Sequence, residues 1–340
     1  MEKKRVKIVL CGYYGRGNFG DEVILSQIQK KIRATFDGYR VELRVLRTKS
    51  PAGVLSAIVG ADIFIFGGGS LLQNATSDAS FFYYIALIGL ARLTVRHLVM
   101  LANGIGPIRG GFLPRTAYLR ALGWAAAQFD DLSVRDSESQ MLLNSVLRKK
   151  QARIIPDPAF CCFKNGGKIN HRLIKDKYIV FIPCRGQVKR TFGGAKGLAR
   201  WLEKLKNDVA CEVIVAVLNP EEDLSLARRI ALQLGGRVAV IKSVSQARAV
   251  LGCAKLVVSQ RYHGALFAAG CGAPTLAVSD DPKMCALCRQ LGLKIVKKAD
   301  KSGADSATEA SPSALYTLTR SADSELSAIF AKLEKQFSKH

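Results

Sequence analysis

The chain has 340 residues, with 51 lysines and arginines against 27 acidic residues, and its formal net charge is +24. At roughly 100–200 residues per domain, this length predicts two domains. Hydrophobic residues make up 49% of the sequence, enough for buried cores, which excludes a globally disordered chain. The excess of positive charge predicts an anionic partner: a phosphorylated substrate, an anionic membrane surface or nucleic acid.

Cysteine usage and the apolar runs indicate the compartment. The nine cysteines are an odd number, and several lie in apolar runs, as Cys11 and Cys253 do, which is typical of small core residues in a reducing compartment. Only about six apolar residues follow the basic N-terminus, too few for a signal peptide. The longest apolar run, residues 81–91, is shorter than the roughly 20 residues that span a bilayer. We therefore expect a cytoplasmic protein.

Strand-like and helix-like patterns alternate in the first half of the chain. Strands are predicted at residues 6–11, 40–46, 63–66, 98–102 and 131–134, and helices at 22–36, 56–60, 81–93, 114–128 and 138–147. The pattern starts again after residues 154–158 and the polar stretch 164–177. Strands then follow at 178–183, 211–218, 238–241, 256–258 and 275–278, with helices at 197–206, 221–234, 245–251 and 264–269.

This order of elements predicts an α/β fold. Repeated β-loop-α units favour two doubly wound, Rossmann-like domains with parallel sheets, facing a cleft. The expected domains are residues 1–165 and 166–300. Residues 301–340 are expected to hold a linker, rich in Ser, Ala and Asp over 299–313, and a closing helix at 324–337.

Three glycine-rich loops follow predicted strands. Residues 15–20 match G-x-G-x-x-G between a strand and a helix, the dinucleotide fingerprint. No acidic residue ends the second strand, so NAD fits poorly, whereas NADP held by Arg47 is left open. The alternative is a tight turn in which Asp21 and Glu22 stabilise the helix N-terminus. With the loops at 67–70 and 103–106, however, these glycines predict a ligand crevice at the carboxyl edge of the sheet.

Basic residues follow the strands of the second half. Arg261 and His263 lie two residues apart after the strand at 256–258, Lys283 follows the strand at 275–278, and Arg185 follows the strand at 178–183. Arginines can bind phosphate and carboxylate bidentately, so this cluster suits a small, densely charged substrate. His263 is the one histidine placed for acid–base work, and its alternative is a capping or core histidine.

Three other features have open interpretations. Arg135 ends the strand at 131–134, where it either faces the ligand or pairs with Asp136 or Glu138 on the surface. Cys285 and Cys288 form a single C-x-x-C, which we interpret as cysteines buried in a helix, with zinc or redox chemistry as the alternative. The sequence shows no metal-ligand set, Walker loop or Ser-His-Asp motif.

Seven motifs follow one another along the chain, at residues 12–22, 66–73, 104–107, 133–136, 157–160, 261–263 and 281–283. In this order they resemble the motifs of the polysaccharide pyruvyl transferases of the bacterial cell-wall type, and the resemblance covers roughly residues 6–290. It implies two domains similar to B-type glycosyltransferases, with the acceptor on the N-terminal side and the donor on the C-terminal side. It also implies phosphoenolpyruvate as donor and a pyruvyl ketal on a sugar diol as product. The implied acceptor is a lipid-linked N-acetylmannosamine-type sugar at the cytoplasmic face.

The residues and the resemblance together predict a site and a mechanism. His263 and Arg261 are the predicted catalytic residues, with His263 protonating the methylene carbon while a sugar hydroxyl attacks C2. Asp21, Glu22 and Asp157 are alternative bases for the acceptor. No cofactor or metal is expected, because the basic residues can neutralise the donor. The predicted donor-binding residues are Arg135, Arg185, Arg261, His263 and Lys283, and the predicted acceptor-binding residues are Gly15, Gly17, Asn18, Asp21, Ser70, Gln73 and Asn103.

One long segment lacks acidic residues. Residues 79–129 contain no Asp, Glu or Lys, but they contain five arginines among several aromatic residues. This composition predicts docking on an anionic membrane or binding of a polyprenyl pyrophosphate. The alternative is a chance gap with some of the aromatics buried. A peripheral location on the inner face of the plasma membrane follows from the first interpretation.

Two other functions remain open at this stage. A nucleotide-sugar-dependent glycosyltransferase of the same fold is the first alternative, because a fold alone does not determine function. The second is a nucleic-acid-binding protein, suggested by charge alone. We expect no nucleic acid partner, because no recognisable readout motif is present and the basic residues lie in enzyme-like loops.

Overall fold

The computed structural model describes residues 3–47, 50–75, 77–148, 150–164, 178–298 and 307–338. Its backbone contacts divide the chain into two compact units. Unit 1 comprises Met1–Gly15, Asp21–Cys161 and Ser321–His340, and unit 2 comprises Arg16–Gly20 and Cys162–Arg320. The expected domain boundaries at 165/166 and 300/301 lie outside the described residues, as does the 299–306 part of the expected linker. Two segments thus belong to the unit from which they are distant in sequence. The glycine loop Arg16–Gly20 belongs to unit 2, and the C-terminal segment Ser321–His340 belongs to unit 1.

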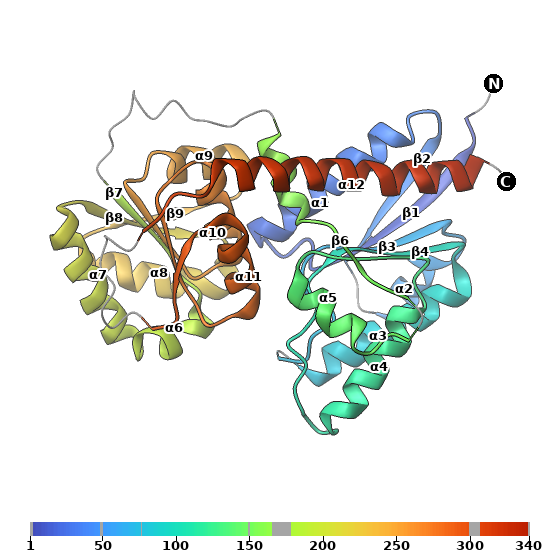
Figure 1. The fold of residues 1–340 in the computed structure, drawn as a ribbon, viewed down its shortest axis with the longest axis horizontal. Coiled ribbons are helices and arrows are strands. Elements are labelled where there is room, and N and C mark those ends of the chain that lie inside the picture. The colour runs from blue at the N-terminus through green and yellow to red at the C-terminus, as the bar shows by residue number, and fades with distance from the viewer. Residues whose placement is uncertain are drawn as a thin grey trace. The chain divides into compact units, whose positions relative to one another are not determined.

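The described part of unit 1 contains a parallel sheet of six strands in the order β2-β1-β3-β4-β5-β6 (Figure 1). The strands are β1 (Arg5–Cys11), β2 (Arg40–Leu46), β3 (Ile63–Gly67), β4 (His97–Asn103), β5 (Asp131–Val134) and β6 (Arg153–Ile154). Every residue of β3 is buried, as is typical of a central parallel strand covered on both faces. The doubly wound fold predicted for the first half is therefore confirmed.

Helices cover both faces of this sheet. Helices α2 to α5 lie on one side in Figure 1, and α1 and α12 on the other. Right-handed crossovers produce this division, because the chain moves toward β2 after β1 and in the opposite direction after β2. The helices are α1 (Phe19–Thr35), α2 (Pro51–Ile58), α3 (Asp78–Thr94), α4 (Arg115–Ala127), α5 (Ser137–Asn144) and α12 (Pro312–Ser338).

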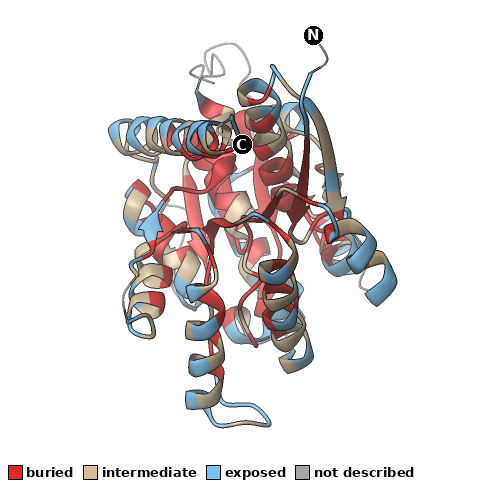
Figure 2. Ribbon diagram, turned by 90° about the vertical axis from the view of Figure 1, so that its right-hand side faces the viewer, coloured by how far each residue is buried: buried red, intermediate tan, exposed pale blue. Residues whose placement is uncertain are grey.

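The described part of unit 2 repeats this architecture. Its parallel sheet has six strands in the order β12-β11-β10-β7-β8-β9. The strands are β7 (Tyr178–Ile182), β8 (Glu212–Val217), β9 (Arg237–Val240), β10 (Leu256–Ser259), β11 (Thr275–Val278) and β12 (Lys294–Val296). The helices are η1 (Pro158–Phe163), which spans the boundary between the units, α6 (Arg185–Phe192), α7 (Ala195–Val209), α8 (Pro220–Leu234), α9 (Val244–Gly252), α10 (Tyr262–Gly270) and α11 (Pro282–Leu291). In Figure 2 the strands are mostly red, whereas the outer sides of the helices are pale blue.

The structure contains elements that the sequence patterns do not predict. These are β6, β12, α6, α11 and η1. The two strands are edge strands of two and three residues, too short to show an alternating pattern. The last helix also begins at Pro312 rather than near residue 324, because the Ser311 hydroxyl accepts from the Ala314 amide and proline suits the first helical position.

Candidate active site

Four predicted basic residues share one sheet edge in unit 2. Arg185 follows β7, Arg261 and His263 follow β10, and Lys283 follows β11. These three strands are neighbours in the sheet and run parallel, so their carboxyl ends lie along the same edge. Ligands of doubly wound sheets bind outside this edge. The sheet therefore gathers Arg185, Arg261, His263 and Lys283 at the position where a ligand is expected.

A rigid turn carries Arg261 and His263. The Ser259 hydroxyl donates to the Arg261 carbonyl (2.8 Å) and accepts from the Arg261 amide (3.2 Å). Gln260, which is buried, donates to the Thr191 hydroxyl (2.8 Å) and accepts from the Cys184 amide (3.0 Å). These bonds tie the end of β10 to the adjacent β7–α6 segment, and His263 follows in the first turn of α10.

Arg261 is anchored by acidic residues that the sequence analysis does not single out. Its Nε donates to Asp223 Oδ2 (2.8 Å), and its Nη2 lies 2.5 Å from Glu222 Oε2. Asp223 is fully buried and also accepts from the Arg185 amide (2.9 Å), so one carboxylate holds two of the basic residues. Burial acts to lower the pKa of Arg261, but the nearby Cys184, Asp223 and Glu222 raise it above its ordinary value. The guanidinium therefore stays charged. The signal for this anchor was the acidic first turn of α8, directly after β8.

The other two basic residues are more accessible. Lys283, in the first turn of α11, is half-buried, and its Nζ lies 3.5 Å from Asp281 Oδ2. Arg185, the first residue of α6, is exposed. Neither side chain is held by two carboxylates as Arg261 is, so both can turn toward an anion.

The glycine loop of unit 2 lies against His263. The Phe19 amide donates to the Leu218 carbonyl (2.8 Å), and the rings of Phe19 and Phe267 are 4.8 Å apart. A Cβ at Gly20 would overlap the His263 imidazole. The close contact with His263 therefore requires glycine at the last position of the G-x-G-x-x-G pattern.

Replacing Gly20 with alanine is expected to destabilise the protein by about 1–3 kcal/mol, because the methyl group has no space beside His263. Replacing Gly38, whose Cβ position is open, is expected to be neutral or to stabilise by about 0.4–1 kcal/mol through the unfolded chain. Urea unfolding of both variants measures the difference. Equal changes in the free energy of unfolding would contradict the close contact.

In unit 1 a buried arginine organises the carboxyl edge. Arg135 is only 4% exposed, with its Nε 3.4 Å from Asp136 and its Nη1 3.4 Å from Asp157. Its Nη2 donates to the Ser70 hydroxyl (3.1 Å), and a Cβ at Gly104 would lie 2.7 Å from the same nitrogen. Of the five predicted donor-binding residues, Arg135 alone belongs to unit 1, and its charge is balanced by two carboxylates.

A buried tyrosine lies at the same edge of unit 1. The Tyr14 hydroxyl donates to the Gly67 carbonyl. Its ring occupies the space that a Cβ at Gly12 would need, and its hydroxyl oxygen lies 2.7 Å from the position of a Cβ at Gly67. Burial raises the pKa of Tyr14 well above its ordinary value, and the negative charges of Asp21 and other nearby groups raise it further. Tyr14 is therefore a protonated donor that shapes the loop, a role that the sequence analysis does not assign.

The predicted acceptor-binding residues are divided between the units. Asp21 and Asn103 are buried in unit 1, and Asn103 donates to the Phe66 (2.8 Å) and Leu101 (3.2 Å) carbonyls. Asn18, in unit 2, accepts from the Gly20 amide (3.3 Å) and thereby caps α1. In unit 1 lie Gly15, Asp21, Ser70, Gln73 and Asn103, and in unit 2 lie Gly17 and Asn18.

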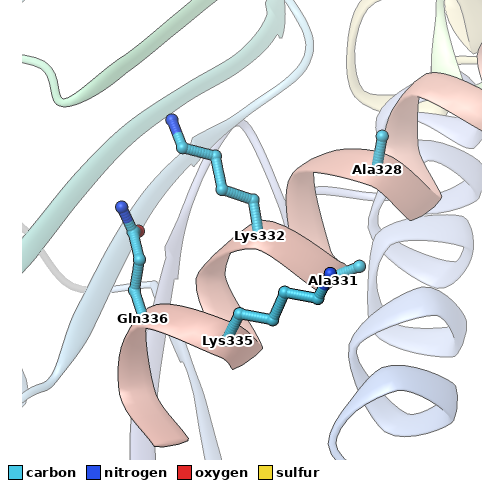
Figure 3. A pocket seen from close by; sticks show the side chains of 5 residues that line it. All are labelled: Ala328, Ala331, Lys332, Lys335 and Gln336. Atoms are coloured by element: carbon cyan, nitrogen blue, oxygen red, sulfur yellow. The ribbon is translucent and has the colours of Figure 1, made fainter. Parts of the chain in front are cut away.

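Other features add no chemistry to these two edges. A pocket beside α12 is lined by Ala328, Ala331, Lys332, Lys335 and Gln336 (Figure 3). Lys332 pairs with Asp131 (3.0 Å) at the first residue of β5, so this pocket lies at the amino edge of the sheet. The described cysteines form no disulfide bond. The C-x-x-C lies in helix α11 as predicted, with Cys288 buried and Cys285 half-buried.

The described residues contain neither a candidate metal site nor a helix able to span a membrane. Within them, no group of His, Cys, Asp and Glu side chains is arranged to hold a metal ion. None of the helices in the described ranges combines the length and the apolar character needed to cross a bilayer.

The sequence matches the family model of the polysaccharide pyruvyl transferases over residues 18–282. This span is more than half of the chain and contains Arg135, Arg185, Arg261 and His263. The chain belongs to the polysaccharide pyruvyl transferase family. The family resemblance of the motifs is thereby confirmed, and the protein is a transferase. Among curated proteins, none matches this sequence.

Solved structures of nucleotide-sugar enzymes share this family member's fold. The UDP-GlcNAc 2-epimerase of Methanocaldococcus jannaschii, in complex with UDP-GlcNAc and UDP, is 10% identical, with 99% of this chain and 100% of that chain covered and a TM-score of 0.57. The Neisseria meningitidis UDP-GlcNAc 2-epimerase, bound to UDP-GlcNAc, is 12% identical, with 98% of each chain covered and a TM-score of 0.53. Anabaena HepE, in complex with UDP and glucose, is 14% identical, with 98% of each covered and a TM-score of 0.51. This likeness shows the fold, similar to B-type glycosyltransferases, and not the substrate.

Proposed function

We propose that this polysaccharide pyruvyl transferase moves the three-carbon unit of phosphoenolpyruvate onto a sugar diol as a pyruvyl ketal. The observation that carries the proposal is the basic edge of unit 2, with Arg185, Arg261, His263 and Lys283 after three adjacent strands. Phosphoenolpyruvate carries one phosphate and one carboxylate, and arginine and lysine bind both groups by charge-assisted hydrogen bonds. The family match supports the transfer of a pyruvyl group.

The proposed reaction has two stages. Protonated His263 donates its proton to the C3 methylene carbon of the donor while one sugar hydroxyl attacks C2 and loses its own proton. The C2–O bond to phosphate then breaks and inorganic phosphate leaves. The second hydroxyl of the sugar attacks C2 to close the ketal and gives its proton to His263, which returns to its protonated state. Arg261 and Lys283 stabilise the charge that develops on the departing phosphate.

The remaining residues have supporting roles in this proposal. Arg135 is also proposed as a donor ligand; because two carboxylates lie beside it, it would contribute hydrogen bonds rather than net charge. Asp21, Glu22 and Asp157 are the carboxylates proposed to accept the proton of the sugar hydroxyl. The proposed acceptor is a polyprenyl-linked N-acetylmannosamine-type sugar used in cell-wall polysaccharide synthesis.

Supplying phosphoenolpyruvate with an N-acetylmannosamine glycoside whose 4- and 6-hydroxyls are free tests the proposal. We expect phosphate release together with a product of the mass of the acceptor plus a pyruvyl ketal. The 4-deoxy glycoside is the matched control, since it lacks the second nucleophile and cannot close the ketal. Sugar transfer from UDP-N-acetylglucosamine without consumption of phosphoenolpyruvate would instead favour a nucleotide-sugar glycosyltransferase.

A further inference from the structure

Gln260 joins the two segments that carry the arginines of the unit 2 edge. It lies between the last residue of β10 and Arg261, and it is only 1% exposed. Its amide donates to the Ile182 carbonyl at the end of β7 (2.9 Å), and its Oε1 accepts from the Cys184 amide (3.0 Å). Because Cys184 directly precedes Arg185, this one residue connects the segment of Arg185 with the segment of Arg261.

The amide nitrogen of the Gln260 side chain holds helix α6. Its Nε2 donates to the Thr191 hydroxyl (2.8 Å), which in turn donates to the Gln187 carbonyl (3.0 Å). Gln187 Nε2 donates back to the Gln260 carbonyl (3.3 Å). A hydroxyl has a single proton, and that of Thr191 is engaged by Gln187, so Thr191 can only accept from Gln260. The orientation of the Gln260 amide group is therefore fixed.

The inner face of α6 is largely polar. The buried residues of this helix are Gln187, Val188 and Thr191, of which only Val188 is apolar. Buried polar groups are costly when they lose their partners, so a network in which each bond supports the next has one preferred geometry. The position of Arg185, the first residue of α6, is therefore set by the bonds of Gln260 together with the Asp223 carboxylate, which accepts from the Arg185 amide (2.9 Å).

The two segments that Gln260 joins follow neighbouring strands. β7 and β10 pair in parallel, with Ile182 opposite Ser259, so their backbones lie about 4.8 Å apart. Arg185 follows β7, whereas Arg261 and His263 follow β10. A ligand with two anionic groups can be bound by both segments at once, whereas a single small anion needs only one of them. Phosphoenolpyruvate, the proposed donor, has a phosphate and a carboxylate on the same carbon atom.

We propose that Gln260 is a positioning residue that sets the spacing between Arg185 and Arg261 and thereby selects a donor with two anionic groups. Because it is buried, Gln260 does not contact the donor and acts through the two segments that it joins. Its hydrogen-bond partners all belong to unit 2. The inference rests on the proposed function, since it takes phosphoenolpyruvate as the donor.

Equilibrium binding of phosphoenolpyruvate and of inorganic phosphate to the full chain tests this role without any acceptor sugar. Thr191→Val removes the hydroxyl that accepts from Gln260 and is expected to raise the Kd for phosphoenolpyruvate about fivefold, the equivalent of one net hydrogen bond. Gln260→Leu removes both side-chain bonds and is expected to raise this Kd about 20-fold. The Kd for inorganic phosphate should stay within about twofold in both variants, because one anion does not require the spacing.

Thr275 provides the matched control for Thr191. It is also a buried threonine whose hydroxyl donates to a backbone carbonyl, that of Ala273 (2.8 Å), but it is the first residue of β11 and lies at the amino edge of the sheet. Thr275→Val should therefore leave both dissociation constants unchanged. Thr191→Ser, which keeps the hydroxyl, is expected to restore the affinity for phosphoenolpyruvate that Thr191→Val loses.

The outcomes separate this inference from the proposed function. Unchanged binding of phosphoenolpyruvate in Thr191→Val and Gln260→Leu would overturn the inference alone. Equal losses for phosphoenolpyruvate and inorganic phosphate would also overturn it, because they would indicate a damaged site rather than an altered spacing. If the unmodified chain does not bind phosphoenolpyruvate, the proposed function fails and the inference fails with it. Urea unfolding shows whether each variant folds, and Thr191→Val decides the test if Gln260→Leu does not.

Discussion

Replacing His263 with glutamine is expected to lower kcat for ketal formation by about 10²–10⁴-fold. Glutamine preserves a polar side chain of similar reach but cannot deliver a proton to the C3 carbon of phosphoenolpyruvate. The KM for phosphoenolpyruvate should change much less, because Arg261 and Lys283 are the residues proposed to hold the charged groups of the donor. Steady-state phosphate release with a sugar diol acceptor measures both constants.

A second histidine provides the control for this experiment. His97 is the first residue of β4, at the amino edge of the unit 1 sheet, and is outside the proposed site. His97→Gln should therefore retain the full rate. Urea unfolding of the His263 variant shows whether the fold is retained. A His263→Gln enzyme that folds normally and turns over at the unmodified rate would refute the acid role.

Replacing Asp223 with asparagine is expected to have the second large effect. The substitution leaves the Arg261 guanidinium, on a side chain that is 18% exposed, without the fully buried carboxylate that bonds its Nε, which should lower the free energy of unfolding by about 3 kcal/mol. Asparagine also offers one acceptor oxygen in place of two, so it cannot serve both Arg261 Nε and the Arg185 amide as the carboxylate does. Since both residues are proposed to bind the donor, we expect the KM for phosphoenolpyruvate to rise at least about tenfold, corresponding to the roughly 1.4 kcal/mol of a weakened charged hydrogen bond.

Glu222 provides the matched control for Asp223. Its carboxylate contacts the same guanidinium, but its side chain is 52% exposed, so water replaces it readily. Glu222→Gln should therefore change the free energy of unfolding by less than about 1 kcal/mol. Urea unfolding and donor titration of the two variants make the comparison. If the two substitutions have the same effect, Asp223 is not the anchor of Arg261.

Much of the fold follows from local patterns. Strands such as Asp131–Val134 and Thr275–Val278 were predicted to the residue, because short apolar runs between turn residues have few other structures available. Hydrophobic periodicity does not predict an element that is short or polar. Helix Arg185–Phe192 contains four strongly polar residues in eight, and strand Arg153–Ile154 is exposed, so neither shows a hydrophobic period.

The candidate site, like the fold, could be predicted only in part from the sequence. Arg261, His263 and Lys283 could be singled out because each follows a recognisable strand, and parallel strands bring their carboxyl ends to one edge. Asp223 could not be recognised as the partner of Arg261, because 38 residues separate them and only the neighbouring positions of β8, β7 and β10 bring them together. The contact between Gly20 and His263 is equally non-local.

The sequence by itself determined the excess of positive charge, the alternating elements and the edge that carries the basic residues, because all three depend on composition or on local periodicity. Only the tertiary structure decided which charges are compensated. It pairs Arg135 with Asp136 and Asp157, anchors Arg261 on Asp223, and leaves Arg109 exposed without an ion pair to any described residue. The physical reason is that electrostatic interactions depend on distance and burial, and these quantities are set by packing between residues far apart in the chain.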